Sequence, residues 1–198
     1  MPPPVVIGLG NPGPRYAGTR HNLGFEVVET LARGAGAGFR QGRGDYLVAV
    51  SPVSDMLLIR PSTYMNLSGS AVSAVCRELG AEPGRVLVVL DDIALPLGTL
   101  RLRAKGSDGG HHGLASVIEA LGSPEIPRLR LGVGPAVMPP AELLAAYVLA
   151  RFEPEERPVV DRMVERASEA VKTWADSGID VAMNRFNTQD RELDDPDH

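Results

Sequence analysis

Short apolar runs and stretches with helical spacing alternate along the chain. Runs rich in Val, Ile and Leu predict strands, and apolar residues that recur every three or four positions predict amphipathic helices. Strands that alternate with helices favour an α/β fold, a single-domain three-layer α/β/α sandwich around a twisted, mixed and mostly parallel sheet. We expect strands at 4–10, 46–50, 56–60, 85–92, 99–105 and 128–134, and helices at 22–33, 66–80, 113–121 and 158–178.

Two of these segments predict which side chains are buried. The strand at 99–105 places leucines on one side and the cations Arg101, Arg103 and Lys105 on the other, as strand alternation requires. The helix at 66–80 ends at Gly80, a typical stop signal. Its apolar face is expected to contain Leu67, Ala71, Val72, Val75 and Leu79.

Length and composition are those of an ordinary globular protein. The 198 residues, 43% of them hydrophobic, fit one domain, which we expect over 1–188, followed by a disordered acidic tail over 189–198. The one cysteine, Cys76, excludes an internal disulfide and a thiolate metal cluster. No apolar run has the length of a membrane span or of a signal peptide, so we expect a cytoplasmic protein. A net charge of -5 argues against nucleic-acid binding over the whole surface but permits a local basic patch.

The first strand ends in the glycine-rich stretch 8–13 ("GLGNPG"), which satisfies the G-x-G-x-x-G pattern of dinucleotide-binding turns. Such a turn needs a helix directly after the glycines and an acidic residue about 20 positions further on, at the end of a second strand. Here the helix is delayed until after His21, and the expected acid position falls inside that helix. We therefore reject a cofactor site. A tight turn with positive φ would explain Gly10 and Gly13, but neither Asn11 nor His21.

Several polar residues are candidates for chemistry. Asp91 and Asp92 end a buried strand, where a carboxylate is costly without a partner. Either could accept a hydrogen bond from His21 and fix its tautomer, or cap the following turn, and the residues leave both interpretations open. Asn66 either caps the helix that it precedes or presents its amide to a substrate carbonyl or an oxyanion.

The segment 105–113 ("KGSDGGHHG") is either an anion site at a helix N-terminus or a flexible turn. Its histidines, His111 and His112, permit a metal site with His21 and the two aspartates, but the spacing matches no metal motif such as H-E-x-x-H. The cations that alternate along the strands at 99–105 and 128–134 form either solvated faces or a compact phosphate-binding patch.

Together these segments resemble the bacterial peptidyl-tRNA hydrolase family. The resemblance rests on "GLGNPGPRYAGTRHNLGF", "PSTYMNLSG", "VVLDDIALPLGTLRLRAKGSDGGHHGL" and "RLRLGVG" and extends from Val5 to about Phe186. It implies an enzyme that cleaves the ester between a peptide and the 3′ ribose of tRNA. It also implies a single α/β/α domain without metal or cofactor.

By position, the resemblance implies that His21 is the general base and that Asp91, rather than Asp92, orients it. Asn11 and Asn66 would position the water, the peptide carbonyl and the oxyanion. The implied substrate-binding residues are Tyr16 near the 3′-terminal nucleotide, Met65, Ile93 and Val148 along the peptide, Arg103, Lys105 and Arg130 at the phosphates, and in addition Tyr64 and His112. The expected partner is peptidyl-tRNA, contacted at its acceptor stem, 3′ end and peptide by a monomer that has no membrane attachment.

The chain departs from the family pattern in two places. G-G-H-N-G is replaced by residues 109–113 ("GGHHG"), so His112 stands where the family has an asparagine that helps to hold the peptide or water. Met138-Pro139-Pro140 lies where relatives often carry lysines that contact tRNA. Two rival functions remain, an RNA- or protein-binding module without hydrolysis and a metal-assisted esterase or nuclease. The pair of His21 and Asp91 favours hydrolysis over simple binding.

Overall fold

The computed structural model describes residues 3–52 and 55–193, and within them one sheet of seven strands has the order β2-β3-β4-β1-β5-β7-β6. The four central strands, β4, β1, β5 and β7, run parallel, and antiparallel pairing adds β3 and β2 at one edge and β6 at the other. The prediction of a mixed sheet is confirmed. The strands are β1 (Val5–Gly8), β2 (Arg40–Gln41), β3 (Tyr46–Val50), β4 (Leu57–Pro61), β5 (Val86–Pro96), β6 (Leu100–Arg103) and β7 (Arg128–Gly134).

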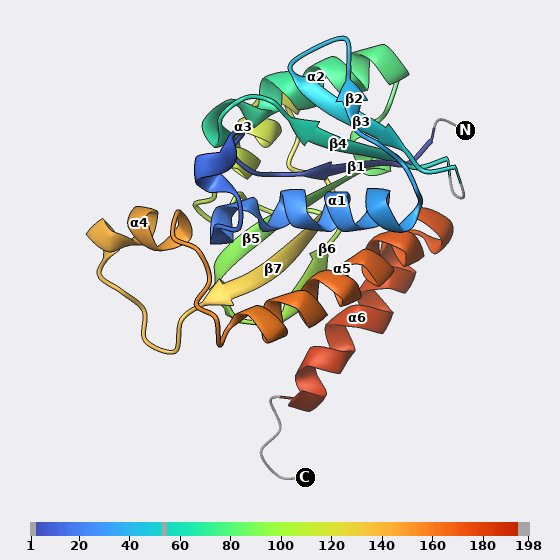
Figure 1. Cartoon of the computed structure of the whole chain (residues 1–198). Helices are drawn as coiled ribbons and strands as arrows, with labels where there is room; N and C mark the ends of the chain where they lie inside the picture. The colour runs from blue at the N-terminus through green and yellow to red at the C-terminus, as the bar shows by residue number, and fades with distance from the viewer. Residues whose placement is uncertain (1–2, 53–54, 194–198) are drawn as a thin grey trace.

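Helices cover both faces of this sheet, as Figure 1 shows. One layer consists of α1 (Leu23–Gly34), α5 (Arg157–Ser177) and α6 (Ile179–Leu193), and the other of α2 (Ser68–Leu79) and α3 (His112–Leu121). The short α4 (Leu144–Val148) lies away from both layers, at the left of Figure 1. The predicted three-layer sandwich is confirmed. Short 3-10 turns are η1 (Pro14–Tyr16), η2 (Arg20–Asn22), η3 (Met65–Leu67), η4 (Pro83–Arg85) and η5 (Ala141–Leu143).

Strand alternation divides the core into two apolar clusters. In β1, Val5 and Ile7 pack with α2 and α3, whereas Val6 packs with α1, α5 and α6. This division follows from the two-residue period of a strand, which sends neighbouring side chains to opposite faces. No helix among the described residues is long and apolar enough to cross a membrane.

Helix α2 begins later than the apolar pattern predicts. Residues 65–67 form the 3-10 turn η3, and Leu67 is 54% exposed, so its predicted place on the apolar face is wrong. A 3-10 turn has three residues per turn rather than 3.6, which rotates Leu67 off that face. The rest of the prediction fits: Val72 and Val75 are buried, and Gly80 ends the helix with φ of 60°.

At the other end of the chain, α6 continues to Leu193 and therefore includes 189–193 of the segment expected to be a tail. Residues 194–198 lie outside the described part of the chain. The side chain of Asn187 in α6 pairs with both backbone groups of Leu102 in β6, at 2.8 and 3.0 Å. This contact covers a strand edge that would otherwise expose unpaired backbone groups.

The glycines of the β1 turn meet two different requirements, close packing at Gly10 and a positive φ at Gly13. A Cβ on Gly10 would lie 2.7 Å from the ring of Phe25 in α1. Gly13 has a φ of 100°, as predicted, but Gly10 is not among the residues with positive φ, so that prediction is wrong for Gly10. Its requirement is steric, because α1 lies directly against the turn.

Gly8 and Gly24 bring β1 and α1 into backbone contact. A Cβ on Gly8 would lie 2.1 Å from the carbonyl oxygen of Gly24, and a Cβ on Gly24 would lie 2.4 Å from the backbone nitrogen of Leu9. This approach fixes the start of α1, and therefore η2 just before it, against the end of β1.

Replacing Gly24 by alanine should therefore destabilise the fold by about 1–3 kcal/mol, as overpacking a core does. The matched control is Gly34→Ala in the same helix, where an added Cβ meets nothing within 4 Å; it should be neutral or stabilise slightly, because alanine favours helix. Urea unfolding of both variants tests this. Equal stability of Gly24→Ala and the wild type would contradict the packing argument.

Candidate active site

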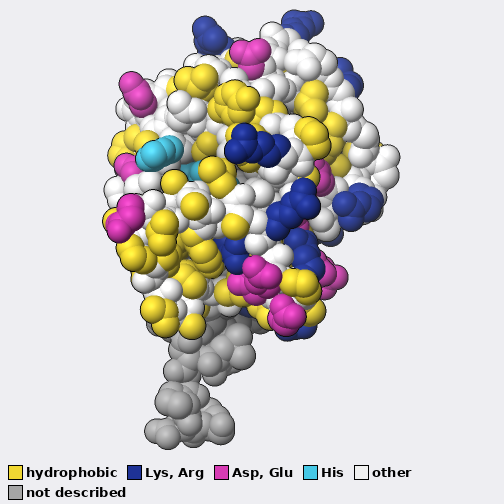
Figure 2. Space-filling model, turned by 60° about the vertical axis from the view of Figure 1, so that its left-hand side comes forward, with side chains coloured by type: hydrophobic (Ala, Val, Ile, Leu, Met, Phe, Trp, Pro, Cys, Tyr) yellow, Lys and Arg dark blue, Asp and Glu magenta, His cyan; other side chains and the backbone are white. Residues whose placement is uncertain are grey.

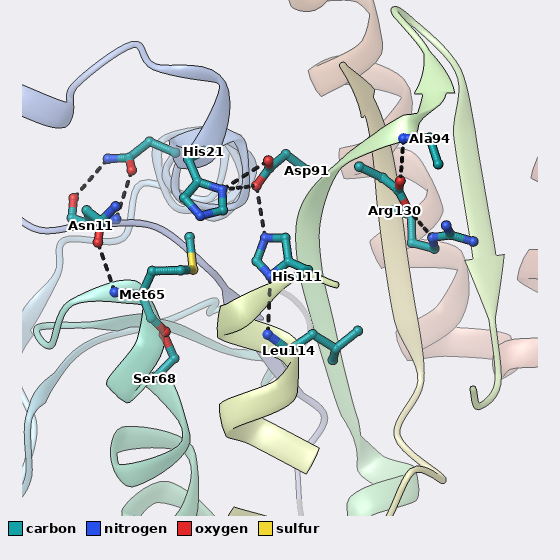
Figure 3. Close-up of polar contacts among 11 residues, drawn as sticks. Asn11, His21, Met65, Ser68, Asp91, Ala94, His111, Leu114 and Arg130 are labelled. Carbon is teal, nitrogen blue, oxygen red and sulfur yellow. Dashed lines mark hydrogen bonds and ion pairs between the residues drawn. The ribbon is translucent and has the colours of Figure 1, made fainter. Parts of the chain in front are cut away.

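The carboxyl ends of β4 and β1 and the middle of the neighbouring parallel strand β5 supply the polar groups of one site. β1 leads into the loop with Asn11 and then into η2, β4 leads into η3, and Asp91 lies on β5 next to the end of β1. The glycine turn, the strand carboxylates and the loop after β4 therefore converge, as expected for sites at strand ends. Figure 3 shows these side chains facing one another.

His21 and Asp91 are hydrogen-bonded to each other. His21 Nδ1 lies 2.9 and 3.0 Å from the two carboxylate oxygens of Asp91, which is only 2% exposed. An ionised carboxylate can only accept, so Nδ1 is the donor, and in the neutral imidazole Nε2 is then the nitrogen with the lone pair. In Figure 3 the second ring nitrogen of His21 points away from Asp91. The arrangement therefore leaves His21 with one nitrogen able to accept a proton.

A second histidine, His111, also contacts this carboxylate. Its Nε2 lies 3.1 Å from Asp91 Oδ1, and its Nδ1 accepts a hydrogen bond from the backbone N–H of Leu114 at 3.2 Å. Because a backbone N–H can only donate, Nδ1 must be unprotonated, and Nε2–H is the donor to Asp91. His111 is thus a neutral N-cap of α3 that donates to the same carboxylate as His21, and the centroids of the two imidazole rings lie 4.8 Å apart.

These contacts determine the ionisation of Asp91. Burial alone would raise the pKa of this carboxyl, but the interactions with His111 and His21 outweigh it and hold the pKa well below its usual range. Asp91 is therefore ionised at neutral pH. A buried carboxylate of this kind stabilises an imidazolium as it forms.

Asn11 is held in one orientation by backbone groups. Its Oδ1 accepts a hydrogen bond from Met65 N–H at 2.8 Å, and Asn22 brackets its backbone with two bonds, at 2.8 Å to N–H and 2.9 Å to the carbonyl. Since Oδ1 is occupied as an acceptor, Nδ2 is the group left to donate. Asn11 therefore presents a donor of defined orientation.

Asn66 follows Met65 in η3 and is exposed. The residue at the N-cap of α2 is Leu67, so the interpretation of Asn66 as that cap is wrong, because the 3-10 turn moves the helix start two residues along. Its amide lies one residue from the N–H that holds Asn11. The alternative, that Asn66 faces the substrate, stays a prediction.

Two aromatic rings of the predicted substrate set contact each other. Tyr16 of η1 and Tyr64 before η3 meet edge to face, with ring centroids 6.4 Å apart, and Tyr64 is 58% exposed. The guanidinium of Arg15 lies 5.6 Å from the Tyr16 ring centroid. The pair joins the two loops that also carry Asn11 and Asn66.

Asp92 has a different role from Asp91. Its Oδ1 accepts a hydrogen bond from Ala94 N–H at 2.8 Å, and its other oxygen pairs with Arg130. Of the two interpretations of the strand carboxylates, the hydrogen bond with His21 is formed by Asp91. The cap of a following turn is wrong, because β5 continues to Pro96 and the bond between Ala94 and Asp92 lies within this strand, where its register shifts.

The remaining predicted cations are Arg103 on β6, Lys105 just after it, and Arg130 on the neighbouring strand β7. Arg103 and Lys105 are exposed, Lys105 pairs with Glu125 at 3.0 Å, and Arg130 is half-buried. Arg128, on the same strand as Arg130, is buried, and its guanidinium donates to four backbone carbonyls. The surface patch thus contains fewer cations than the sequence pattern indicates.

The other predicted residues lie on elements around the site. Met65 is 5% exposed and its sulfur packs against the first turn of α3, since a Cβ on Gly113 would lie 2.4 Å from it. His112 is exposed in that same turn, Ile93 is half-buried on β5, and Val148 is half-buried on α4.

The metal interpretation fits these residues poorly. His21, Asp91 and His111 offer ligand atoms within 4.8 Å of one another. However, each histidine nitrogen that faces Asp91 carries a proton in the hydrogen-bond pattern above, whereas a metal requires the lone pair there. Binding would need both tautomers to change and would break the bond from Leu114. His112 and Asp92 are not in this group.

Sequence reasoning missed two residues of the site. It considered His111 only as a metal ligand, although its place directly before an apolar helical pattern indicates an N-cap. It assigned no role to Asn22, whose two bonds to the backbone of Asn11 depend on a contact between chain segments 11 residues apart. No local sequence pattern predicts this contact between Asn22 and Asn11.

Fold and site together define a hydrolytic enzyme of the α/β class, with a carboxylate-oriented histidine at the strand ends. The chain belongs to the peptidyl-tRNA hydrolase family, whose model matches residues 5–194. Proteins named peptidyl-tRNA hydrolase are similar to it. That of Chlorobaculum parvum is 49% identical over an alignment that covers 92% of this chain and 97% of the relative. That of Chloroflexus aggregans is 46% identical, and its alignment covers 92% of this chain and 98% of the relative. The crystal structure of peptidyl-tRNA hydrolase from Acinetobacter baumannii superposes with a TM-score of 0.87 at 31% identity, covering 93% of this chain and 94% of that one.

The lowered pKa of Asp91 predicts a pH-dependent stability. As the pH is lowered, the carboxyl of the unfolded chain, with a pKa of about 3.9, takes up its proton at a higher pH than the carboxyl of the folded protein. Asp91 therefore stabilises the fold fully above that pKa, and this contribution to the free energy of unfolding is lost as the pH falls below it. The free energy of unfolding of the wild type should therefore fall more steeply than that of Asp91→Asn between roughly pH 5 and pH 2. The control is Asp161→Asn, which removes an exposed carboxylate. Parallel curves for wild type and Asp91→Asn in urea unfolding would refute the assignment.

Proposed function

We propose that the protein hydrolyses the ester between a peptide, or an N-blocked amino acid, and the 3′ ribose of tRNA, and so releases free tRNA. The observation that carries this proposal is the hydrogen bond from His21 Nδ1 to the buried carboxylate of Asp91. It occurs in a chain whose relatives are named for this reaction.

In the proposed mechanism, His21 Nε2 takes a proton from water while the water oxygen attacks the ester carbonyl carbon. The tetrahedral intermediate collapses by breaking the bond between that carbon and O3′ of the ribose. The imidazolium then returns its proton to O3′. The products are a peptide carboxylic acid, which ionises, and tRNA with a free 3′ hydroxyl. Asp91 stabilises the imidazolium between the two proton transfers.

Amide donors stabilise the charge that develops on the carbonyl oxygen. Asn11 suits this role because its Oδ1 is held by Met65 N–H, which leaves Nδ2 as the donor. Asn66 follows Met65 in the chain, and its side chain is exposed. Amide groups also distinguish a neutral peptide bond from the charged amine of an unblocked amino acid, because an amide carbonyl accepts what an ammonium cannot.

Apolar surface beside the site suits the peptide. In this proposal Met65, Ile93 and Val148 would line the peptide groove, with His112 in the family's asparagine position. Figure 2 looks onto this side of the molecule, where hydrophobic side chains gather near the histidines. The segment between β7 and α5 adds exposed apolar side chains in place of lysines, namely Val137, Met138, Leu143 and Leu149.

The tRNA would contact Arg103, Lys105 and Arg130, with the Tyr16–Tyr64 pair at the 3′ end. Arg130 is joined to the site through Asp92, the neighbour of Asp91. We propose that the enzyme acts as a monomer in the cytoplasm, where its substrate would arise.

The decisive test is hydrolysis of N-acetyl-aminoacyl-tRNA. The wild type should release N-acetyl amino acid, spare unblocked aminoacyl-tRNA, and lose activity by about 10²–10⁴-fold or more in His21→Ala, because the base is removed. Chromatography of the released product measures the rate, and thermal unfolding confirms that the variant is folded.

Two outcomes would favour the rival functions. Tight binding of tRNA without release of the acyl group by the wild type would indicate a binding module. Loss of hydrolysis in EDTA that a divalent ion restores would indicate the metal-assisted mechanism. We expect activity to persist in the chelator, because the tautomers of His21 and His111 leave no nitrogen lone pair facing Asp91.

The basic patch predicts a salt effect. Arg103→Gln should weaken tRNA binding and reduce the slope of log K against log salt by about one, since one phosphate contact is lost. Lys172→Gln on α5 removes an exposed cation from a helix on the opposite layer from α2 and α3 and is the matched control. Filter binding at several salt concentrations measures both slopes. Equal slopes for the two variants would remove Arg103 from the tRNA surface.

A further inference from the structure

The residue before the proposed general base is a buried arginine. Arg20 is 4% exposed, although arginine is rarely buried without a specific partner. Its backbone N–H donates to the carbonyl of Ala150 at 3.1 Å, and Thr19 forms an isolated antiparallel bridge with Arg151. The chain entering η2 is therefore paired with a segment about 130 residues further on.

The guanidinium of Arg20 strengthens this pairing from several directions. One terminal nitrogen donates to the carbonyl of Arg151 at 2.8 Å, and the other pairs with Glu156 at 2.7 Å. Its carbon lies 4.2 Å from the ring centroid of Tyr147 and 5.0 Å from that of Phe152. All of these partners belong to one stretch of chain, from the end of α4 to the start of α5.

Tyr147 connects this arrangement to the substrate side. Its ring stacks on Arg20, and its hydroxyl donates to the carbonyl of Val133 in β7 at 2.7 Å. Val148, the proposed peptide contact, is the next residue of α4. Because α4 lies away from the two helical layers (Figure 1), these contacts anchor it to the body of the protein.

We infer that Arg20 is a positioning residue, which fixes His21 and helix α4 in one geometry relative to each other. One side of Arg20 is joined to His21 by a single peptide bond, and the other holds Tyr147, adjacent to Val148. The inference rests on the proposed function, since it concerns the placement of its general base and its peptide contact. It gives Arg20 no contact with the substrate.

Arginine is required because the contacts use its shape. The planar fork donates in two directions, to a carbonyl and to a carboxylate, while its faces stack on two aromatic rings. Lysine keeps the charge but can neither stack as a plane nor form the same fork. Arg20→Lys should therefore retain part of the function, and Arg20→Met should lose the polar contacts while keeping much of the volume.

The matched control is Arg157→Met. Arg157 joins α5 to α1 by pairing with Glu26, so it is also an arginine that bridges two elements through a carboxylate. Its guanidinium carbon lies 6.0 Å from the ring centroid of Phe152, which Arg20 approaches more closely, but among the described residues no hydrogen bond joins Arg157 to the 147–151 segment. Loss of stability alone should affect both methionine variants, whereas misplacement of His21 should occur only in Arg20→Met.

Two measurements test the inference. The first is the kinetics of N-acetyl-aminoacyl-tRNA hydrolysis, with Arg157→Met as the reference. In Arg20→Met, kcat should be lower about tenfold or more while KM stays within about threefold, since small displacements of a base slow chemistry. The kcat of Arg20→Lys should lie between those of the two methionine variants. Long-range ¹H–¹⁵N correlation spectra should show His21 protonated only at Nδ1 in the wild type and Arg157→Met, and both tautomers in Arg20→Met, because displacement weakens the bond to Asp91.

A folded Arg20→Met protein with the kcat or the His21 tautomer of Arg157→Met would overturn the inference. If Arg20→Met does not fold, kcat and the His21 tautomer are measured in Arg20→Lys instead. A change in KM without a change in kcat, or a His21 tautomer equal to that of the wild type, would then contradict the inference. The spectra separate this inference from the proposed function, since a wild type that hydrolyses nothing refutes the reaction while the tautomer still reports on Arg20.

Discussion

One ionised carboxylate, buried near the end of β1 on the neighbouring strand β5, constrains the structure around it. Asp91 would be costly in that position without donors, and its two donors, His21 and His111, come from 70 and 20 residues away. Both can reach it only because β1 lies next to β5 and because α3 begins at the same end of the sheet. The fold thus supplies the partners, and the partners keep the carboxylate charged.

Backbone N–H groups set the orientation of the side chains in this site. The N–H of Leu114 fixes the tautomer of His111, and the N–H of Met65 fixes the amide of Asn11. A backbone donor cannot reverse its role, whereas an imidazole or an amide can. The choice of Nδ1 of His21 as the donor follows in turn from the carboxylate of Asp91, which can only accept. Such preorganisation is what electrostatic catalysis needs, because the groups do not have to reorient during the reaction.

The sequence predicts the elements well because their apolar periods are local, and it fails where contacts between elements decide. The residue pattern alone left the choice between Asp91 and Asp92 open, and only the family resemblance selected Asp91. In β5, Asp91 lies on the same face of the sheet as Leu87 and Val89, which pack in the cluster with α1. Asp92, as the next residue of the strand, lies on the opposite face. Choosing between them requires knowing which face α1 covers. The prediction for Gly10 fails for the same reason. Glycine is required at this position because the ring of Phe25 in α1 leaves no room for a Cβ, and not because of the backbone conformation of Gly10.

The arginines show why counting charges overstates a nucleic-acid surface. Arg20 and Arg128 are buried and bind backbone carbonyls, so they hold loops rather than solvent-exposed phosphates. Arg130 is half-buried and paired with Asp92. That pair matters for the site, since Asp92 follows Asp91 directly in β5. The ion pair of Arg130 therefore lies one residue along β5 from the carboxylate that accepts the hydrogen bond of His21.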